Sequence, residues 1–396
     1  MEKHLMKSVL ACSIAFLGSQ VQAAETGAAG IAWGPVSVYP SLGFAMENDD
    51  NIYLSNIIRQ SSVVNVVSPA VRFEAHHHGD IYALTYHADL GRYNSANNNN
   101  YNDQHLVGQF NVGLSMRAAI KLRPEYSLGH DPIGTTYGGF TSVPNRWRNT
   151  GISGVFGYGA ENAKGRIELS AGTLITKYLN NRFLTYAYDK TTDNAGATFF
   201  YRVMPKTSLL FEASDTRYVY DSPTSLIPNN SVRNYLVGAK WEATAKTTGD
   251  FRIGQVQQRY DGGVIPNYTG TGWSGTIQWN PKTYSKVKLD LSRQPLQTTL
   301  VGTNLYLVTS STVDWAYDLN SRFTSHLNYN RYTEDFGGLG LLTKNNSYGI
   351  GMDYRMRRWL KTSLSWTNWS KTANQIAFNY FDYNRNVVML TLTGTL

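Results

Sequence analysis

The feature that most constrains this chain is a strict alternation of apolar and polar residues in short segments. Residues 166–171 (RIELSA) and 287–292 (VKLDLS) alternate at every position, and residues 84–89 (LTYHAD) follow the same rule. In residues 234–242 the polar set is interrupted by Leu236. A period of two is typical of a β-strand with one apolar and one polar face. The chain is therefore predicted to be all-β.

Short turns and longer polar loops divide these segments. The turn signals lie at His77–Asp80, Arg117–Ala119, Glu161–Lys164, Met204–Thr207, Thr244–Thr248, Asn280–Thr283, Asp318–Ser321 and Arg355–Arg358. The longer loops are predicted at Glu47–Arg59, Ser95–Asn102, Asp131–Asn149, Asp221–Ser231, Asp261–Gly270 and Asp335–Lys344. Short turns at one end and long loops at the other are typical of a transmembrane antiparallel β-barrel. This number of turns predicts about 18 strands, with about 16 as the alternative.

An aromatic residue stands just before six successive short turns, on the apolar parity of its strand. These residues are Tyr158, Tyr201, Trp241, Trp279, Tyr317 and Tyr354. Tyr and Trp are enriched at the interface between membrane and water, where an amphipathic ring lies at the level of the lipid headgroups. The series therefore predicts an aromatic girdle around the barrel.

The N-terminus is typical of an exported protein. Residues 1–23 combine a basic start, an apolar run from Ser8 to Leu17 and the small-residue site Val21-Gln22-Ala23, which predicts a signal peptide. The remaining chain is expected to be a short periplasmic segment at 24–35 and a barrel at 36–396. Cys12 is the only cysteine, so disulfides and thiolate chemistry are excluded from the expected mature chain.

Composition agrees with this class. Charged residues make up 16% and aromatic residues 13% of the 396 residues, and Tyr alone accounts for 27. Soluble domains usually contain about a quarter charged residues. Beyond residue 23 no run of 18 apolar residues occurs, so a transmembrane helix is not predicted. The runner-up class is a soluble periplasmic β-solenoid or propeller.

Several segments resemble a known family. Tyr39-Pro40-Ser41-Leu42 followed by residues 48–53 (NDDNIY) is similar to the opening of the Putative β-barrel porin type 2 family. Further similar segments are Gly129–Pro132, Asn180–Arg182, Arg358–Leu360 and Tyr383–Val387. The resemblance implies a barrel in the bacterial outer membrane. Because some members are encoded with exopolysaccharide or capsule biosynthesis genes, it also suggests polysaccharide export.

Strand parity predicts which charges face the lumen. The formal net charge is +8, but the inward acids and bases nearly balance. The predicted pore-lining residues are Arg72, Glu74, Asp89, Lys121, Arg123, Glu125, Arg166, Glu168, Arg202, Glu212, Lys240, Glu242, Arg252, Lys288, Asp290, Asp314, Asp353, Arg355 and Lys361. Many lie two apart on one face, so either a salt-bridged wall or a polar ladder for a hydrated polymer is expected.

Five arginines near the predicted extracellular loops have the opposite, outward parity. They are Arg92, Arg217, Arg259, Arg293 and Arg331. At that height the outer leaflet offers lipopolysaccharide phosphates, which arginine can bind through two parallel hydrogen bonds. The alternative is that these side chains extend into bulk water. Outer-membrane lipid and lipopolysaccharide are therefore expected partners, and the apolar terminal strand 387–396 is similar to the signal read by the outer-membrane assembly machinery.

Other candidate sites are weaker. Residues 76–78 (HHH) are interpreted as a periplasmic turn, because neighbouring strand residues face opposite ways. Asp49-Asp50-Asn51 could hold a cation but lacks the EF-hand spacing. Asp131, Arg146 and Arg148 lie in the longest predicted loop, which could form a constriction. No motif of a hydrolase, metalloprotease or P-loop enzyme occurs, so we expect no enzyme activity, cofactor, metal or nucleic acid.

The leading functional hypothesis is an outer-membrane channel for export of an exopolysaccharide or capsular polysaccharide, with biosynthesis and export proteins as further partners. The first alternative is a general diffusion porin for small solutes. The second is a structural barrel without transport. An open lumen favours passage of a polymer, whereas loops folded into the lumen favour selection of small solutes.

Overall fold

The computed structural model describes residues 30–134, 141–160, 163–222, 228–244, 246–263, 265–298, 300 and 305–396. The predicted signal peptide (1–23) and residues 24–29 of the predicted periplasmic segment lie outside these ranges. Parts of the loops predicted at Asp131–Asn149 and Asp221–Ser231 lie outside them too. Among the described residues, no helix is long and apolar enough to cross a membrane.

Eighteen long strands form the body of the protein, and a short strand precedes them. Their bounds are β1 Ile31–Trp33, β2 Val36–Asp49, β3 Ser62–His77, β4 Asp80–Tyr93, β5 Tyr101–Gly113, β6 Ala118–Asp131, β7 Asn145–Tyr158, β8 Gly165–Tyr178, β9 Lys190–Met204, β10 Thr207–Tyr220, β11 Asn230–Thr244, β12 Thr247–Tyr260, β13 Tyr268–Lys282, β14 Ser285–Gln297, β15 Leu305–Asp318, β16 Phe323–Phe336, β17 Leu341–Arg357, β18 Leu360–Ala373 and β19 Tyr383–Thr395. Helical turns lie in the longer connections: η1 Asn97–Asn99, α1 Arg182–Thr185, η2 Tyr186–Tyr188, η3 Gly337–Leu339 and η4 Ile376–Phe381.

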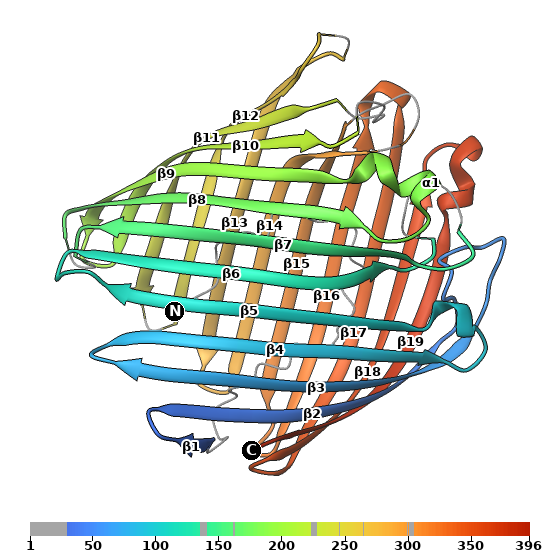
Figure 1. Ribbon diagram of the computed structural model, residues 1–396, viewed down its shortest axis with the longest axis horizontal. Coiled ribbons are helices and arrows are strands. Elements are labelled where there is room, and N and C mark those ends of the chain that lie inside the picture. Colours follow the sequence, from blue (N-terminus) through green and yellow to red (C-terminus); the bar gives the residue numbers. More distant parts are fainter. Residues whose placement is uncertain are drawn as a thin grey trace.

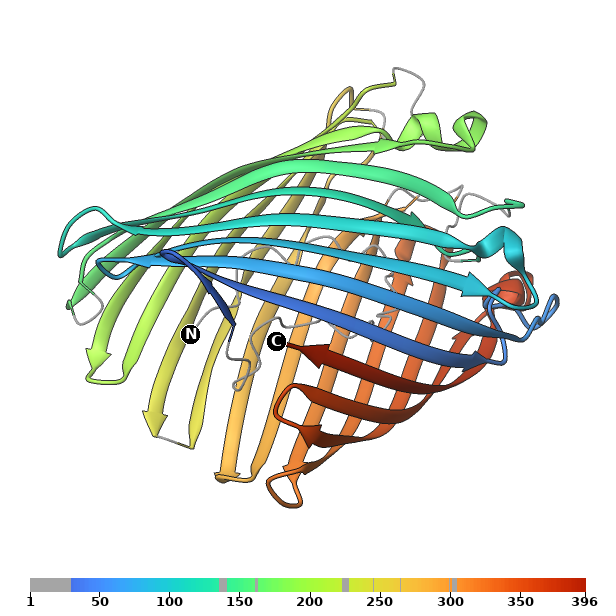
Figure 2. The same cartoon turned by 60° about the horizontal axis from the view of Figure 1, so that its bottom comes forward.

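Each strand from β2 to β19 pairs antiparallel with its neighbours in chain order, and β19 pairs with β2 to close the barrel. In the closing pair, Leu392 lies opposite Phe44 and Val388 opposite Asn48. Figures 1 and 2 show the front wall, from β2 to about β12, facing the wall formed by β13–β19. The predicted number of strands, about 18, and the antiparallel topology are confirmed.

The two ends of the barrel differ. Tight turns join the strands at one end, the left-hand end of the front strands in Figure 1, whereas α1 and η4 lie at the other. We call these the turn end and the loop end. The predicted turn at Asn280–Thr283 is displaced, because a bulge between Trp279 and Lys282 extends β13 to Lys282. A similar bulge between Arg355 and Arg357 carries β17 past the predicted start of the next turn.

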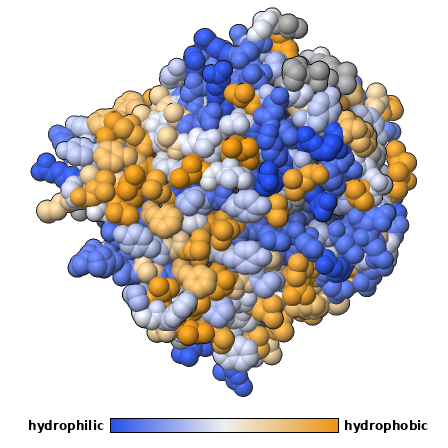
Figure 3. Space-filling view, viewed as in Figure 1, coloured by the Kyte–Doolittle hydropathy of each residue, from blue (hydrophilic) through white to orange (hydrophobic). Residues whose placement is uncertain are grey.

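Exposed apolar side chains identify the outer face. Phe44 of β2 lies opposite Val67 of β3, and on the next pair Tyr86 lies opposite Leu106. All four side chains are large, apolar and exposed. In a strand successive side chains alternate between faces, so the intervening residues point into the barrel. In Figure 3, hydrophobic residues cover much of the wall and hydrophilic ones gather towards the loop end.

The six predicted girdle aromatics all lie on this outer face, at the turn end. The ring of Tyr317 packs edge-on against Tyr284 at 5.3 Å, and Tyr354 stacks on Phe323 at 4.5 Å. Trp241 lies over Gly249, where an added Cβ would stand 2.7 Å from the indole. Aromatic rings thus lie beside the tight turns of several hairpins, where the apolar band of the outer face ends.

Strand β1 was not anticipated from the sequence. It forms a hairpin with β2, in which Ile31 lies opposite Val38 and Trp33 opposite Val36. Gly34 occupies the tight turn with a φ of 61°. The β19 ladder on β2 ends at Ser41, so β1 covers the part of the β2 edge that β19 does not reach. An unpaired edge would otherwise be open to other strands.

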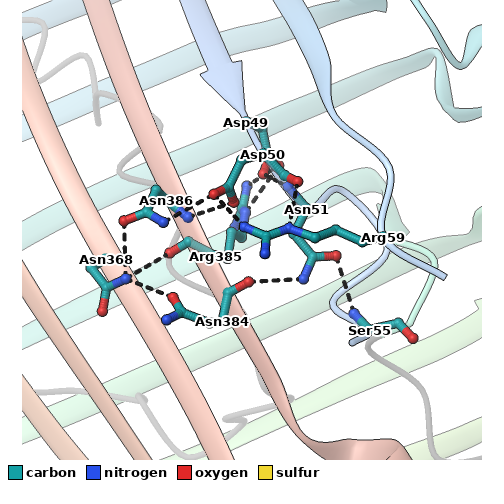
Figure 4. Close-up of polar contacts among 9 residues, drawn as sticks. All are labelled: Asp49, Asp50, Asn51, Ser55, Arg59, Asn368, Asn384, Arg385 and Asn386. Atoms are coloured by element: carbon teal, nitrogen blue, oxygen red, sulfur yellow. Dashed lines mark hydrogen bonds and ion pairs between the residues drawn. The ribbon is translucent and has the colours of Figure 1, made fainter. Parts of the chain in front are cut away.

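The seam between the first and last strands holds a buried ion cluster, of which Figure 4 shows Arg385 and Asp49. Arg385 of β19 lies 3.0 Å from a Glu47 oxygen and 2.7 Å from an Asp49 oxygen of β2. All three side chains are at most 5% exposed, and the guanidinium stacks on the Trp369 ring at 5.0 Å. The cluster therefore ties two segments more than 330 residues apart.

A second layer of the seam lies just beyond the strands. The backbone and side-chain amides of Asn386 donate to Asp50 at 2.7 and 2.9 Å, and Arg59 pairs with Asp50 at 2.6 Å. Burial raises the pKa of Asp50, but these hydrogen bonds outweigh it and leave the pKa below its usual range. The Asn51 amide donates to the Asn384 carbonyl at 2.9 Å. The carboxylates proposed for a cation are thus already paired with nitrogen donors.

The orientation of the barrel can be tested with single cysteines, because the sequence contains no cysteine after Cys12. Ser95→Cys at the loop end should react with a membrane-impermeant maleimide on intact cells, whereas Lys206→Cys at the turn end should not. Both should react after the outer membrane is permeabilised. Labelling of Lys206→Cys on intact cells would show that the orientation is reversed.

The buried seam can be tested by unfolding the barrel in urea. Arg385→Met should lower the free energy of unfolding by about 3–5 kcal/mol, because it leaves Glu47 and Asp49 as buried, unpaired charges. The exposed pair provides the matched control, and Arg59→Met should cost only about 0–1 kcal/mol. Adding Glu47→Gln and Asp49→Asn to Arg385→Met should recover stability. Equal losses for Arg385→Met and Arg59→Met would contradict the seam model.

Candidate functional site

The inner wall is the candidate site, and the strand registers determine which charges lie on it. All nineteen predicted pore-lining residues occupy positions opposite in parity to the exposed apolar side chains. Several form the expected pairs along one strand. Arg72 and Glu74 approach to 2.5 Å, Arg166 and Glu168 to 2.6 Å, Lys288 and Asp290 to 2.5 Å, and Arg123 and Glu125 to 3.6 Å. Whether they line a conducting path stays a prediction.

Other inner-wall charges pair across strands, which sequence spacing could not predict. Arg252 of β12 contacts Glu212 of β10, two strands away. The strand between them has Gly238 opposite Arg252, so no side chain blocks the contact. Arg252 also lies 3.4 Å from Asp250, an inward acid that was not among the predicted pore-lining residues. The pairing therefore depends on the register of three adjacent strands.

A few inner-wall charges have no carboxylate or basic partner in the described part of the chain. Lys240 and Glu242, expected to pair, form no ion pair with each other there, and Lys121 and Arg355 lack a carboxylate partner. Asp353 is contacted by both Lys361 at 3.8 Å and His326 at 3.1 Å. The wall is thus mostly neutralised, and among the charges left isolated the bases Lys121, Lys240 and Arg355 outnumber the acid Glu242.

A loop folds onto the inner wall at the loop end. Ile52, from the loop between β2 and β3 (residues 50–61), packs with the inward side chains of Val64, Val66, Tyr93 and Tyr101 in a buried cluster. A loop that extended away from the barrel could not bury a side chain against this face. We name residues 50–61 the first loop. It therefore occupies space inside the mouth of the barrel.

A second loop meets the first one. Gly134 follows β6 with a φ of 89°, and an added Cβ would stand 2.1 Å from the Tyr53 carbonyl oxygen. Asn56 donates its backbone N–H to the Asp382 carbonyl, before β19, at 3.3 Å. The first loop is thus held from two sides, by the connection after β6 and by the one before β19.

The opposite side of the mouth carries a second apolar cluster. Tyr306, Val308, Phe336 and Leu341 are buried on the inward faces of β15–β17. Phe378 and Phe381 of η4 pack against them, together with Leu296 and Leu300. The stacked rings of Tyr306 and Phe336 are 4.8 Å apart. Segments beyond the strand ends therefore cover the inner wall on this side too.

A polar cluster at the loop end joins β14 to β10, β11 and β12. Gln297, at the end of β14, accepts a hydrogen bond from the Tyr220 hydroxyl and donates to the Asn230 side chain at 2.7 Å. Gln258 also donates to Asn230, at 3.3 Å. The β13–β14 ladder extends only to Trp273 and Arg293 towards the loop end, so the end of β14 is free to reach β10 and β11. This contact links β14 to β10 and β11 beyond the end of the β13–β14 ladder.

The predicted constriction loop at Asp131–Asn149 is partly wrong. Arg146 and Arg148 belong to β7, on the outward parity shared with Ile152, because β7 begins at Asn145. Asp131 ends β6 and accepts hydrogen bonds from the Trp147 indole at 3.0 Å and the Tyr178 hydroxyl at 3.1 Å. The strands continue further than the polar sequence suggested. The connection is therefore shorter, and its arginines do not point into the lumen.

Two further groups were candidates from the sequence, the histidines at 76–78 and the five outward arginines. The three histidines do not converge: His76 pairs with Glu74 at 2.6 Å, whereas His77 and His78 contact each other at 2.8 Å. The five outward arginines share the face of the exposed apolar residues. Arg217 lies 4.0 Å from Asp261, and Arg293 lies over the Trp273 ring at 5.2 Å. Contact of these arginines with lipopolysaccharide remains a prediction.

The most deeply buried charged residues were not among the predicted site residues. Glu334 and Lys371 pair at 2.8 Å on the inner wall, where Glu334 is fully buried, and Thr343 donates to the same carboxylate. Arg385 and Glu47 were missed as well. Strand parity would have placed these residues inward. Glu47 stood in a predicted loop and Arg385 in a family segment, and no face was assigned to Glu334 or Lys371.

Known proteins agree with this architecture. The family model Putative beta-barrel porin 2 matches residues 24–396, whereas no curated protein matches the chain. The fold is similar to OccK2 (OpdF) of Pseudomonas aeruginosa, 11% identical, with a TM-score of 0.53 over 91% of this chain and 98% of that one. It is also similar to Pseudomonas aeruginosa OpdK with vanillate, 12% identical, with a TM-score of 0.51 over 91% of this chain and 99% of that one. Acinetobacter baumannii OccAB3 is 10% identical, with a TM-score of 0.51 over the same shares of the two chains.

At these identities the solved structures establish the fold alone, and the family match extends over nearly the whole chain. A closed antiparallel barrel with an outer apolar band spans the bacterial outer membrane. The chain belongs to the Putative beta-barrel porin 2 family of outer-membrane barrels.

Proposed function

We propose that the protein is a diffusion channel for small hydrophilic solutes. The observation that carries this proposal is the packing of the first loop and η4 onto the inner wall at the mouth. These segments reduce the opening while charged side chains keep the wall polar. A small solute can pass such a mouth more readily than a bulky hydrated polymer.

Polysaccharide export, the leading hypothesis from the sequence, has less support. It rests on the family resemblance, and the structural neighbours give it none. One of them, OpdK, has a structure with vanillate, a small molecule, which agrees in kind with the present proposal. The match at 12% identity does not extend that ligand to this chain, so vanillate enters here only as one probe among others.

The size of the permeating solute can be measured by liposome swelling with the purified barrel. Neutral sugars of increasing size should permeate progressively more slowly, because the infolded segments narrow the mouth. Replacing residues 52–58 by an equal-length Gly-Ser segment should raise the size limit. The matched control replaces residues 261–267, where Gly262 and Gly263 have no atoms within 4 Å of an added Cβ, and should leave the limit unchanged.

The competing hypothesis has its own measurement in cells. Deletion of the gene should leave surface polysaccharide at wild-type levels and slow the uptake of small solutes. Loss of surface polysaccharide, with a purified barrel that passes no small sugar, would reject the diffusion channel in favour of export.

Ion selectivity should be weak in planar bilayers, because most inner-wall charges are paired. A slight preference for anions is expected from Lys121 and Lys240, so Lys121→Gln with Lys240→Gln should shift the reversal potential towards cations. Arg72→Gln is the contrasting variant, since it releases Glu74 and should produce a cation preference. Strong anion selectivity that survives both changes would contradict this assignment of the wall.

A further inference from the structure

A pocket of about 320 Å³ lies in the wall at the loop end, between β4 and β7. It is lined by Arg92, Asn100, Tyr101, Asn102 and Arg146. Four of these residues also line an adjoining pocket of about 290 Å³ that extends to His130, Trp147 and Asn180. The two spaces therefore form one continuous groove, and two arginines stand at its outer part.

The groove exists because β5 and β6 separate towards the loop end. The β5–β6 ladder ends towards the loop end at Gln104 and Leu128, whereas β6 stays paired with β7 as far as Asp131 and Asn145. The His130 ring fills part of the gap, stacking on Tyr101 at 4.3 Å and contacting Asp103 at 3.0 Å. The opening is thus a feature of the strand register and not of a mobile side chain.

Both arginines face outward. Arg92 shares the parity of Leu84 and Tyr86 on β4, and Arg146 shares that of Ile152 on β7. Arg92 stands ten residues beyond Tyr82, which lies at the turn end. At about 3.3 Å per residue and a tilt of about 40°, this is roughly 25 Å along the barrel axis, the height of the apolar band. With the short turns on the periplasmic side, as is general for such barrels, Arg92 therefore lies at the level of the outer-leaflet headgroups.

Neither guanidinium is neutralised within the described residues. Arg92 donates to the carbonyls of Gly91 and Tyr101 at 2.8 and 2.9 Å and to the Asn102 side chain at 2.9 Å. These contacts hold it in place but use three of its five N–H groups. The Arg146 guanidinium forms no hydrogen bond or ion pair in the same part of the chain.

One acid, Asp103, lines the groove among the described residues, and it is already engaged. It contacts His130, whose side chain is 7% exposed. The other outward arginines differ, since Arg217 has Asp261 beside it and Arg293 lies over Trp273. One arginine held in place, a second with a free guanidinium, side-chain amides and a carboxylate already engaged by histidine make a site for a compact, strongly charged anion.

We propose that this groove binds a phosphate group of lipopolysaccharide in the outer leaflet, with Arg92 and Arg146 as the two cationic contacts. The free N–H groups of Arg92 and the fork of Arg146 would each donate to phosphate oxygens. Outward parity and headgroup height favour a lipid phosphate over a free anion. The site is independent of what passes through the lumen.

The test uses the full barrel purified in detergent, with phosphorylated lipid A as the probe and native mass spectrometry as the readout. The wild-type protein should retain phosphorylated lipid A and lose its dephosphorylated form. Arg92→Gln with Arg146→Gln should weaken retention about tenfold or more, since charge-assisted contacts are lost. Arg217→Gln, also outward, is the matched control and should retain the lipid.

Three further readouts decide the source of the anion and the integrity of the variants. Inorganic phosphate at equal concentration should not displace the lipid, and displacement would assign the groove to free phosphate and overturn the proposal. Equal retention by the wild type and the double variant, or retention of dephosphorylated lipid A, would also overturn it. Unchanged heat-modifiable mobility and conductance of the double variant confirm that the barrel is folded and that the site lies outside the pore.

Discussion

The structure depends on one constraint: in hydrocarbon, each backbone N–H and C=O must be paired within the protein, so a sheet that spans a membrane must close. Here closure requires the last strand to pair with the first, and β19 meets β2 from Ser41 to Asp49. The inward side of that seam carries Arg385 between Glu47 and Asp49. Burying these charges is tolerable only when they are together, so the cluster favours one register of closure over neighbouring registers.

The same closure positions the mouth. Residues directly after β2 and directly before β19 are joined by Asp50, Asn386, Asn51 and Asn384, which anchors the first loop beside the seam. From there the loop reaches the inward faces of β3–β5, where Ile52 is buried. The contacts that close the wall of the barrel thus also anchor the loop at its mouth. A change at the seam affects both the stability of the barrel and the shape of its opening.

Much of this architecture could be predicted from alternation, turn spacing and the aromatic series, because each records a local property of a strand. Arg72 and Glu74 pair as their spacing suggested. Contacts that depend on register could not be predicted in this way, since Arg252 reaches Glu212 across the strand of Gly238 only when three strands are aligned. Loop boundaries failed where polar strands such as Asn145–Arg148 resemble loops. The segments that carried the family resemblance, near Asp49–Asn51 and Asn384–Asn386, meet in space at the seam.

The separation of the seam charges along the chain has a consequence for biogenesis. Glu47 and Asp49 enter the periplasm with the first strand of the barrel, and their counter-ion belongs to the last strand, 336 residues beyond Asp49. A polypeptide that ends early can form most of its hairpins, yet it leaves two carboxylates facing the lumen without a cation and two strand edges unpaired. A chain that carries both β2 and β19 satisfies both needs at once. The ion cluster therefore makes the presence of the last strand, as well as the first, a condition for a stable barrel.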